Sequence, residues 1–206
     1  MTLAHCLLAS LVAWNSAPEP APPGSHLWIV NELYSSPDGT VQFVELWECC
    51  GSSIETQMAG KDVFSLGYSF TFPSNLTGDT AYRYLLLGTT AYAALPGAPA
   101  PDYIIPSGFF STTNDTVRWH IYPGATLAFS AGQLPTDGVL SLNFDHTTST
   151  NSPTNYAGQS GSVRLVSVPA LPVSWLIVLV ASALLLGWLV LRRDPGTAGL
   201  QPGSVS

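Results

Sequence analysis

Short runs of β-branched and aromatic residues, separated by Gly, Pro, Asn and Ser, fill the chain from Leu27 to Val168. Such runs predict strands, and the residues between them predict turns. The predicted strands are residues 27–34, 40–47, 62–72, 82–88, 116–122, 125–129, 138–144 and 162–168, with a short helical turn at 91–95. Because amphipathic helical periodicity is almost missing here, the pattern predicts one all-β sandwich or barrel over residues 27–168.

The first two runs, LWIVNELY and TVQFVELW, are separated by SSPDG. Pro37 fixes its own φ, Asp38 can cap the turn with its carboxylate, and Gly39 accepts a positive φ. We therefore expect residues 27–34 and 40–47 to form a hairpin.

A different pattern follows the β region. Residues 175–191 carry no charge, and seventeen residues of helix span about 26 Å, close to the thickness of a bilayer's hydrocarbon core. Trp175 and Trp188 lie near the two ends, where the headgroups favour such rings. The sequence thus predicts a transmembrane helix over 175–191, preceded by a linker at 169–174.

Arg192 and Arg193 set the expected orientation of that helix. Positive charges favour the cytoplasmic side, so residues 192–206 are predicted to be a cytoplasmic tail and the β region to lie outside. An export signal is then expected at the other end. The run CLLASLVAW supplies its apolar core, which predicts a signal peptide over 1–17, followed by a Pro-rich lead-in at 18–26.

The composition and charge of the chain limit the kinds of partner that it can be expected to bind. Acidic residues outnumber basic ones by 13 to 6, the net charge is −7, and only 9% of residues are charged, against about 25% in a typical soluble domain. A nucleic-acid partner is not expected, because it would need clustered Lys and Arg.

The hairpin resembles a known family. Asn31-Glu32, followed after the turn by Phe43, Glu45 and Leu46 in FVEL, is similar to the opening of lamin tail domains. SLGYSFTF and YRYLLLG resemble the segments that follow in that family, and PDYIIPSGFF resembles a loop of its bacterial secreted members. The resemblance implies an immunoglobulin-like β-sandwich in which these residues are structural. It implies a binding or accessory module and no reaction.

The C-terminal segment resembles bacterial PEP-CTERM-type sorting tags, which an intramembrane sorting protease removes. Val168, Pro169 and Pro172 form the Val-Pro-x-x-Pro motif, followed by the apolar helix and the two arginines. The Glu of the strict motif is missing, and residues 194–206 follow the arginines. A permanent anchor and a removable tag both remain open.

Cys49 and Cys50 are adjacent, directly after the second predicted strand. In an oxidising compartment they would form a loop-stiffening disulfide or stay as two buried thiols. A thiol-redox or soft-metal role is the alternative, since strained disulfides are the more easily reduced.

Two further sets of polar residues are candidate sites. Glu32, Glu45 and Glu48 have the chemistry of paired acid–base carboxylates, but we interpret them as structural groups that bind backbone donors. Asn143, Asp145, Asn151 and Asn155, with Thr147–Thr150, make an oxygen-rich loop that would suit calcium, but an ordinary polar loop is favoured because the EF-hand spacing is missing.

Other catalytic patterns are weak. GQSGS at 158–162 departs from G-x-S-x-G, and His26, His120 and His146 lack metal-binding spacing. We expect no catalytic residue, cofactor or metal. The leading hypothesis is a non-enzymatic bacterial envelope protein that binds an envelope protein or a polysaccharide, either as a single-pass membrane protein or released after tail removal. The alternatives are a thiol-redox or metal-handling protein using Cys49 and Cys50, and a calcium-dependent adhesion module.

Overall fold

The computed structural model describes residues 23–165 and 180–188. The chain divides into two units, Met1–Leu165 and Val166–Ser206. The predicted signal peptide lies outside the described residues. So do six of the sorting and anchor residues, Val168, Pro169, Pro172, Trp175, Arg192 and Arg193.

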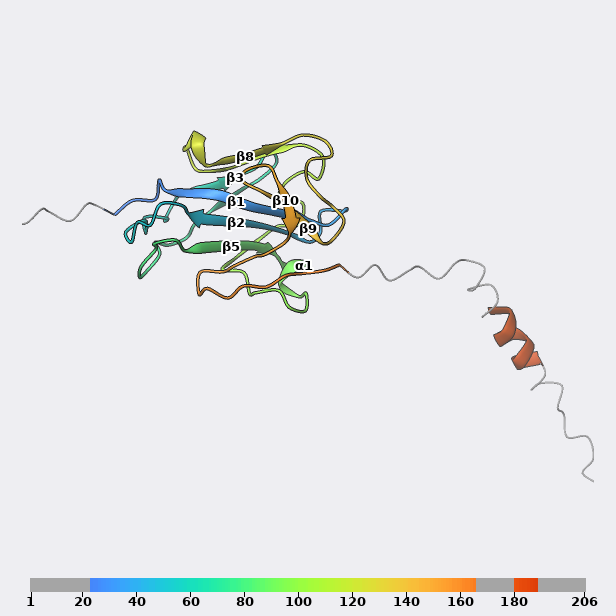
Figure 1. Cartoon of the computed structure of the whole chain (residues 1–206). Coiled ribbons are helices and arrows are strands. Elements are labelled where there is room, and N and C mark those ends of the chain that lie inside the picture. The colour runs from blue at the N-terminus through green and yellow to red at the C-terminus, as the bar shows by residue number, and fades with distance from the viewer. Residues whose placement is uncertain (1–22, 166–179, 189–206) are drawn as a thin grey trace, which may run out of the picture. The chain divides into compact units, whose positions relative to one another are not determined.

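The first unit is built of strands in two sheets (Figure 1). A six-stranded sheet has the order β10-β9-β1-β2-β5-β6, and a four-stranded sheet has the order β4-β3-β7-β8. The strands are β1 (Trp28–Ser35), β2 (Gln42–Glu48), β3 (Asp62–Phe64), β4 (Ser69–Thr71), β5 (Tyr84–Thr89), β6 (Tyr103–Ile105), β7 (Asp115–Trp119), β8 (Thr126–Phe129), β9 (Leu140–Asn143) and β10 (Thr148–Thr150). Two short helices, α1 (Thr90–Ala93) and η1 (Pro123–Ala125), join strands. The predicted all-β, two-sheet character is confirmed.

The predicted hairpin is also confirmed. β1 and β2 pair antiparallel, and Ser36, Asp38 and Gly39 close the turn: Asp38 accepts hydrogen bonds from the Ser36 and Thr40 side chains, and Gly39 has φ +70°. A bulge between Val30 and Glu32 shifts the register of β1 by one residue. β2 is central, because β5 pairs with its other side.

Two strand predictions need correction, and two strands were not predicted. The run at 62–72 is two strands, β3 and β4, joined by a turn at Gly67 in which the Ser65 hydroxyl accepts the Gly67 and Tyr68 amides. Residues 162–165 of the predicted strand 162–168 belong to no strand. β6 and β10, of three residues each, were not predicted.

The main core lies between the two sheets. Trp28, Phe72 and Trp119 are fully buried there, with the rings of Phe72 and Trp119 edge to face at 5.4 Å. The indole N–H of each tryptophan donates a hydrogen bond to a backbone carbonyl. Trp28 donates to the Glu55 carbonyl at 2.8 Å, and Trp119 donates to the Ser25 carbonyl at 2.7 Å. These bonds tie the segment before β1 and the segment after β2 to the core.

A second, smaller core covers part of the other face of the six-stranded sheet. It contains Tyr34, Phe43, Leu86 and Tyr92, with Val163 from the end of the unit. Gly88 makes room for it, because a Cβ at that position would lie 2.5 Å from the Tyr92 ring. This face is therefore partly buried as well.

The C-terminal unit contains a helix over residues 180–188. Within the described parts of the chain, no helix is both long and apolar enough to cross a membrane. Of the predicted span 175–191, residues 175–179 and 189–191 lie outside the description.

Replacing Phe72 with Ala tests the main core. Phe72 is 1% exposed and contacts Trp119 and Tyr103, so we expect Phe72→Ala to lower the free energy of unfolding by about 3–5 kcal/mol in urea titrations. Ile121→Ala is the control, because Ile121 is 74% exposed and its loss should change stability by about 0.5 kcal/mol or less. Equal effects of the two substitutions would contradict this packing.

Candidate functional site

The outer face of the six-stranded sheet, turned away from the four-stranded sheet, holds the unusual polar groups of the fold. Along β2, Val44 and Leu46 point into the main core, so Phe43, Glu45 and Trp47 point outward. Two outward carboxylates, Glu32 and Glu45, are opposite each other in the β1–β2 register. Each is only 1% exposed. Buried, adjacent acids without a cation are costly, so their partners decide what they can do.

Glu32 is held by residues distant in sequence. The Ser141 hydroxyl of β9 donates to Glu32 Oε1 at 2.5 Å, and the Ser152 backbone N–H donates to the same oxygen at 2.9 Å. The Ser152 hydroxyl donates to Oε2 at 3.3 Å. Ser152 belongs to residues 151–165, which follow β10 and cross the outer face; we call this segment the strap.

Glu45 holds the next part of the strap. The Thr154 backbone N–H donates to Glu45 Oε2 at 2.6 Å, and the Asn31 side-chain amide donates to Oε1 at 2.7 Å. Asn31 is the extra residue of the β1 bulge, which explains how its side chain reaches the outer face beside Glu45. The two glutamates thus fix the strap over the centre of the sheet.

The environment shifts the pKa values of both acids upward. Burial raises the pKa of Glu32 despite its hydrogen bonds. Burial and the negative charge of Glu32 together raise the pKa of Glu45 to about 8. Near neutral pH the pair therefore holds a proton, which limits the cost of burying two carboxylates side by side.

In this geometry Glu32 and Glu45 serve to hold the strap on the sheet. The strap covers both carboxylates and uses their oxygens for its own amides. Glu48 is used in the same way at the end of β2: it is fully buried and accepts the backbone N–H groups of Cys50, Gly51, Ser52 and Tyr82.

The strap leaves the other part of the outer face open. Trp47 and Tyr84, neighbours on β2 and β5, are half-buried and stack with their rings 6.3 Å apart and 19° from parallel. Ile29 lies opposite Trp47 on β1. Trp47 lies two residues from Glu45 on the same face of β2. Burial, with the charges of Glu45 and Glu32, raises the pKa of Tyr84.

A hollow of about 280 Å³ lies beside Asn31. It is lined by Asn31, Asn143, Phe144, Asp145 and Thr147. We call this hollow, together with Ile29, Trp47 and Tyr84, the open face. It combines stacked aromatic rings with amide, carboxylate and hydroxyl groups on one surface.

The oxygen-rich loop does not converge on a cation position. Asp145 Oδ1 accepts the Thr147 N–H and hydroxyl, whereas Asn151 is buried and donates to the carbonyls of Val139 and Val163. Throughout residues 23–165 and 180–188, no three His, Cys, Asp or Glu side chains are grouped as metal ligands.

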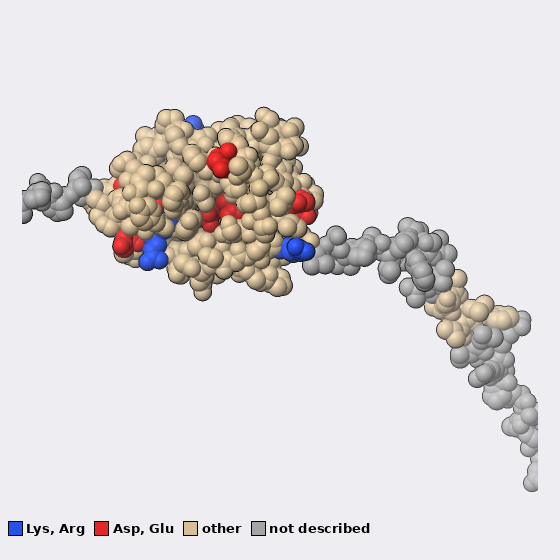
Figure 2. All heavy atoms as spheres, viewed as in Figure 1, with Lys and Arg blue, Asp and Glu red and all other residues tan. Residues whose placement is uncertain are grey.

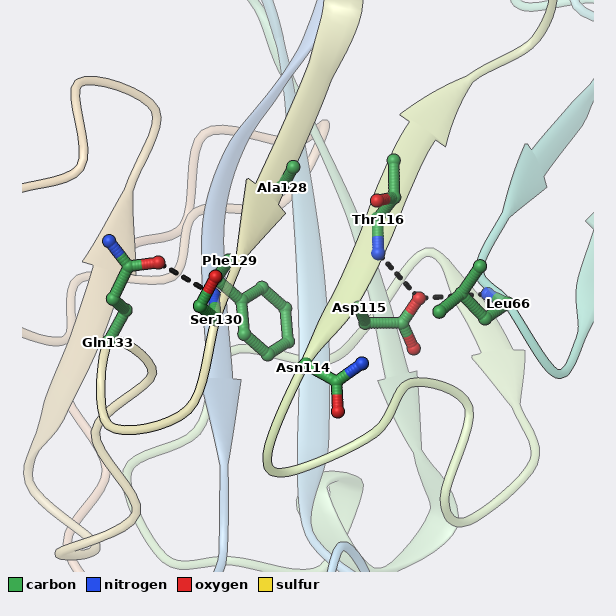
Figure 3. Close-up of a pocket in the computed structure, with 8 residues that line it drawn as sticks. All are labelled: Leu66, Asn114, Asp115, Thr116, Ala128, Phe129, Ser130 and Gln133. Atoms are coloured by element: carbon green, nitrogen blue, oxygen red, sulfur yellow. Dashed lines mark hydrogen bonds between the residues drawn. The ribbon is translucent and has the colours of Figure 1, made fainter.

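A second hollow, of about 290 Å³, lies at the end of the four-stranded sheet (Figure 3). Asp115, at the start of β7, accepts the backbone N–H of Leu66 at 2.8 Å and of Thr116 at 2.6 Å. Gln133 accepts the Ser130 N–H at 2.6 Å. The side-chain oxygens of Asp115 and Gln133 thus brace the neighbouring loops.

Cys49 and Cys50 form a vicinal disulfide, with Cys50 exposed and Cys49 half-buried. The interpretation as two buried thiols is therefore wrong.

The remaining predicted residues take structural positions. Phe43 packs in the second core and Leu46 in the main core. His26 Nδ1 lies 3.5 Å from Glu55 Oε1, and His120 and His146 occupy positive-φ positions at turns.

Comparison with known proteins adds no further constraint, because no family model, curated protein or solved structure matches the chain.

The raised pKa of Glu45 predicts how stability depends on pH. An unfolded Glu has a pKa near 4.5, whereas folded Glu45 has one of about 8, so the folded state retains a proton that the unfolded state releases. The contribution of this group to the free energy of unfolding should therefore be highest below pH 4.5 and fall as the pH rises to 8, by on the order of 5 kcal/mol.

Urea titrations between pH 5 and about 9 measure this slope. Glu45→Gln should flatten it whatever its effect on absolute stability, whereas Asp79→Asn, at an exposed position, should leave it in place. A slope that survives in Glu45→Gln would show that another group titrates.

Proposed function

We propose that this protein is a non-enzymatic binding module of the bacterial envelope, held outside the cytoplasm, and that its open face binds a neutral polysaccharide. The observation that carries the proposal is the stacked Trp47–Tyr84 pair beside the polar hollow at Asn31. Exposed aromatic area next to oriented polar groups is the usual composition of a ligand site.

The chemistry of the open face suits a sugar chain. A pyranose ring has an apolar face that packs on an aromatic ring, and Trp and Tyr supply large, rigid contact surfaces for it. Its hydroxyl groups need both donors and acceptors. The Asn143, Asp145 and Thr147 side chains that line the hollow carry both, in addition to the hydrogen bonds they make with one another. A row of residues along neighbouring strands also matches an extended chain better than a small enclosed ligand.

Charge favours a neutral ligand. The chain has a net charge of −7, and Figure 2 shows only a few scattered Lys and Arg atoms on the face in view. An acidic polysaccharide would be repelled by such a surface, and only weak steering of any anion is expected.

The fold supports a binding module without specifying its ligand. Two packed sheets fit the immunoglobulin-like sandwich that the lamin-tail resemblance implies, and a rigid sheet is a suitable base for a recognition surface. In this proposal the signal peptide directs export, and the segment from Val168 to Arg193 anchors or sorts the protein.

Binding is tested by affinity electrophoresis in gels containing soluble neutral β-glucan, xylan or chitosan-free glycol chitin. At least one polymer should retard the purified protein, and Trp47→Ala and Tyr84→Ala should each weaken binding by about tenfold or more, because each removes a stacking surface. Tyr68→Ala is the matched control: Tyr68 is a 50% exposed aromatic residue on the β3–β4 turn, away from the open face. No retardation by any polymer, or equal loss in all three variants, would refute the proposal.

Cell fractionation with intact-mass analysis tests the anchor. If the tail is a sorting tag, the mature C-terminus should lie between Pro169 and Trp175, with the protein at the surface or in the medium. If it is an anchor, Ser206 should be intact and the protein should stay in the inner membrane. Recovery of the intact chain from the cytoplasm would contradict both.

A further inference from the structure

The Cys49–Cys50 disulfide is placed where a solvent-borne reagent can reach it. It follows β2 directly, and Cys50 is exposed. Export to an oxidising compartment would favour the bonded form at rest.

This bond adds little to the stability of the fold. A disulfide stabilises mainly by restricting the unfolded chain, and the effect grows with the number of residues in the closed loop. Here the bonded residues are adjacent, so the loop is the smallest one possible. A structural staple would be expected between distant segments instead.

Other interactions already fix the surrounding chain. The buried Glu48 carboxylate accepts backbone N–H groups from Cys50 at 3.2 Å, Gly51 at 2.8 Å and Ser52 at 3.1 Å. Gly51 has φ +78° and lies against the Tyr82 ring, where a Cβ would be only 2.6 Å from ring atoms. The Cys49 N–H donates to the Leu27 carbonyl at 3.1 Å. The two sulfurs would therefore stay close together after the bond opens.

We propose that Cys49–Cys50 is a thiol–disulfide exchange site that accepts two electrons from a dithiol. One thiolate of the dithiol attacks the exposed Cys50 Sγ, forming a mixed disulfide and releasing the Cys49 sulfur, which takes up a proton. The second thiolate of the dithiol then attacks the first dithiol sulfur, which is bonded to Cys50 in the mixed disulfide. This step closes the disulfide of the dithiol and releases Cys50, which takes up a proton and becomes the second thiol. The products are the oxidised dithiol and the Cys49 and Cys50 thiols.

Exposure selects the sulfur that is attacked. Thiol exchange needs access to one sulfur, and Cys50 is the more exposed residue of the pair, whereas Cys49 is half-buried. The Glu48 carboxylate holds the backbone N–H groups of Cys50, Gly51 and Ser52. Opening the disulfide therefore does not have to disturb β2.

The first experiment uses the full chain in detergent with Cys6→Ser, so that only Cys49 and Cys50 can react. Dithiothreitol is added without denaturant, the thiols are trapped with iodoacetamide, and peptides are analysed by mass spectrometry. We expect both cysteines to be alkylated while Tm falls by less than about 3 °C. Reduction only in denaturant, or a large fall in Tm, would overturn the proposal and make the bond a structural one.

The second experiment assigns the attacked sulfur. With glutathione disulfide as the probe, Cys49→Ser, which keeps Cys50, should form a mixed disulfide about tenfold faster than Cys50→Ser, which keeps Cys49. Equal rates, or the reverse order, would overturn the exchange route through Cys50. Because polysaccharide is not involved in either experiment, this inference stands or fails separately from the proposed function.

Discussion

The burial of two facing carboxylates on the outside of a sheet is the constraint on which this structure depends. Glu32 and Glu45 cannot be left bare in an apolar setting, and no basic side chain pairs with either of them among the described residues. Their partners are instead a hydroxyl from β9 and backbone amides of the strap. The strap is thereby fixed across the sheet, and Val163, near its end, joins the second core. The position of the strap in turn decides which part of the outer face is closed and which is open.

Local signals in the sequence predicted much of the sheet but not the strap. The β1–β2 hairpin was predictable because alternation, turn chemistry and register are encoded within about twenty residues. The partners of Glu32 and Glu45 were not, because Ser141, Ser152 and Thr154 are more than 100 residues away in sequence and resemble ordinary loop residues. Residues 162–165 of the predicted strand at 162–168 form no strand, for a related reason. Its apolar residue Val163 packs onto an existing sheet through side-chain and backbone contacts with Asn151, without joining a ladder.

Short strands and surface aromatics mark the other limits of sequence reasoning. β6 and β10 have three residues each, too few for a periodic pattern, and β3 and β4 were merged because the turn between them contains Leu66 and Tyr68. Trp47 and Tyr84 lie in two predicted strands, and nothing in the local sequence indicates that they stack. Their pairing is visible only in the β2–β5 register, which joins segments about 40 residues apart. The oxygen-rich loop suggested Asp145 as a cation ligand, whereas its carboxylate caps its own turn.

β2 connects these features physically. From Phe43 in the second core, its outward side chains continue through Glu45 beneath the strap to Trp47 on the open face, and the strand ends at Glu48 beside the disulfide. Because β1 and β5 pair with both sides of β2, these groups sit on a rigid element with fixed spacing. On the outer face, Glu45 is flanked along β2 by Phe43 and Trp47. Phe43 belongs to the second core and Trp47 to the open face, so the buried acid lies between these two parts of the outer face.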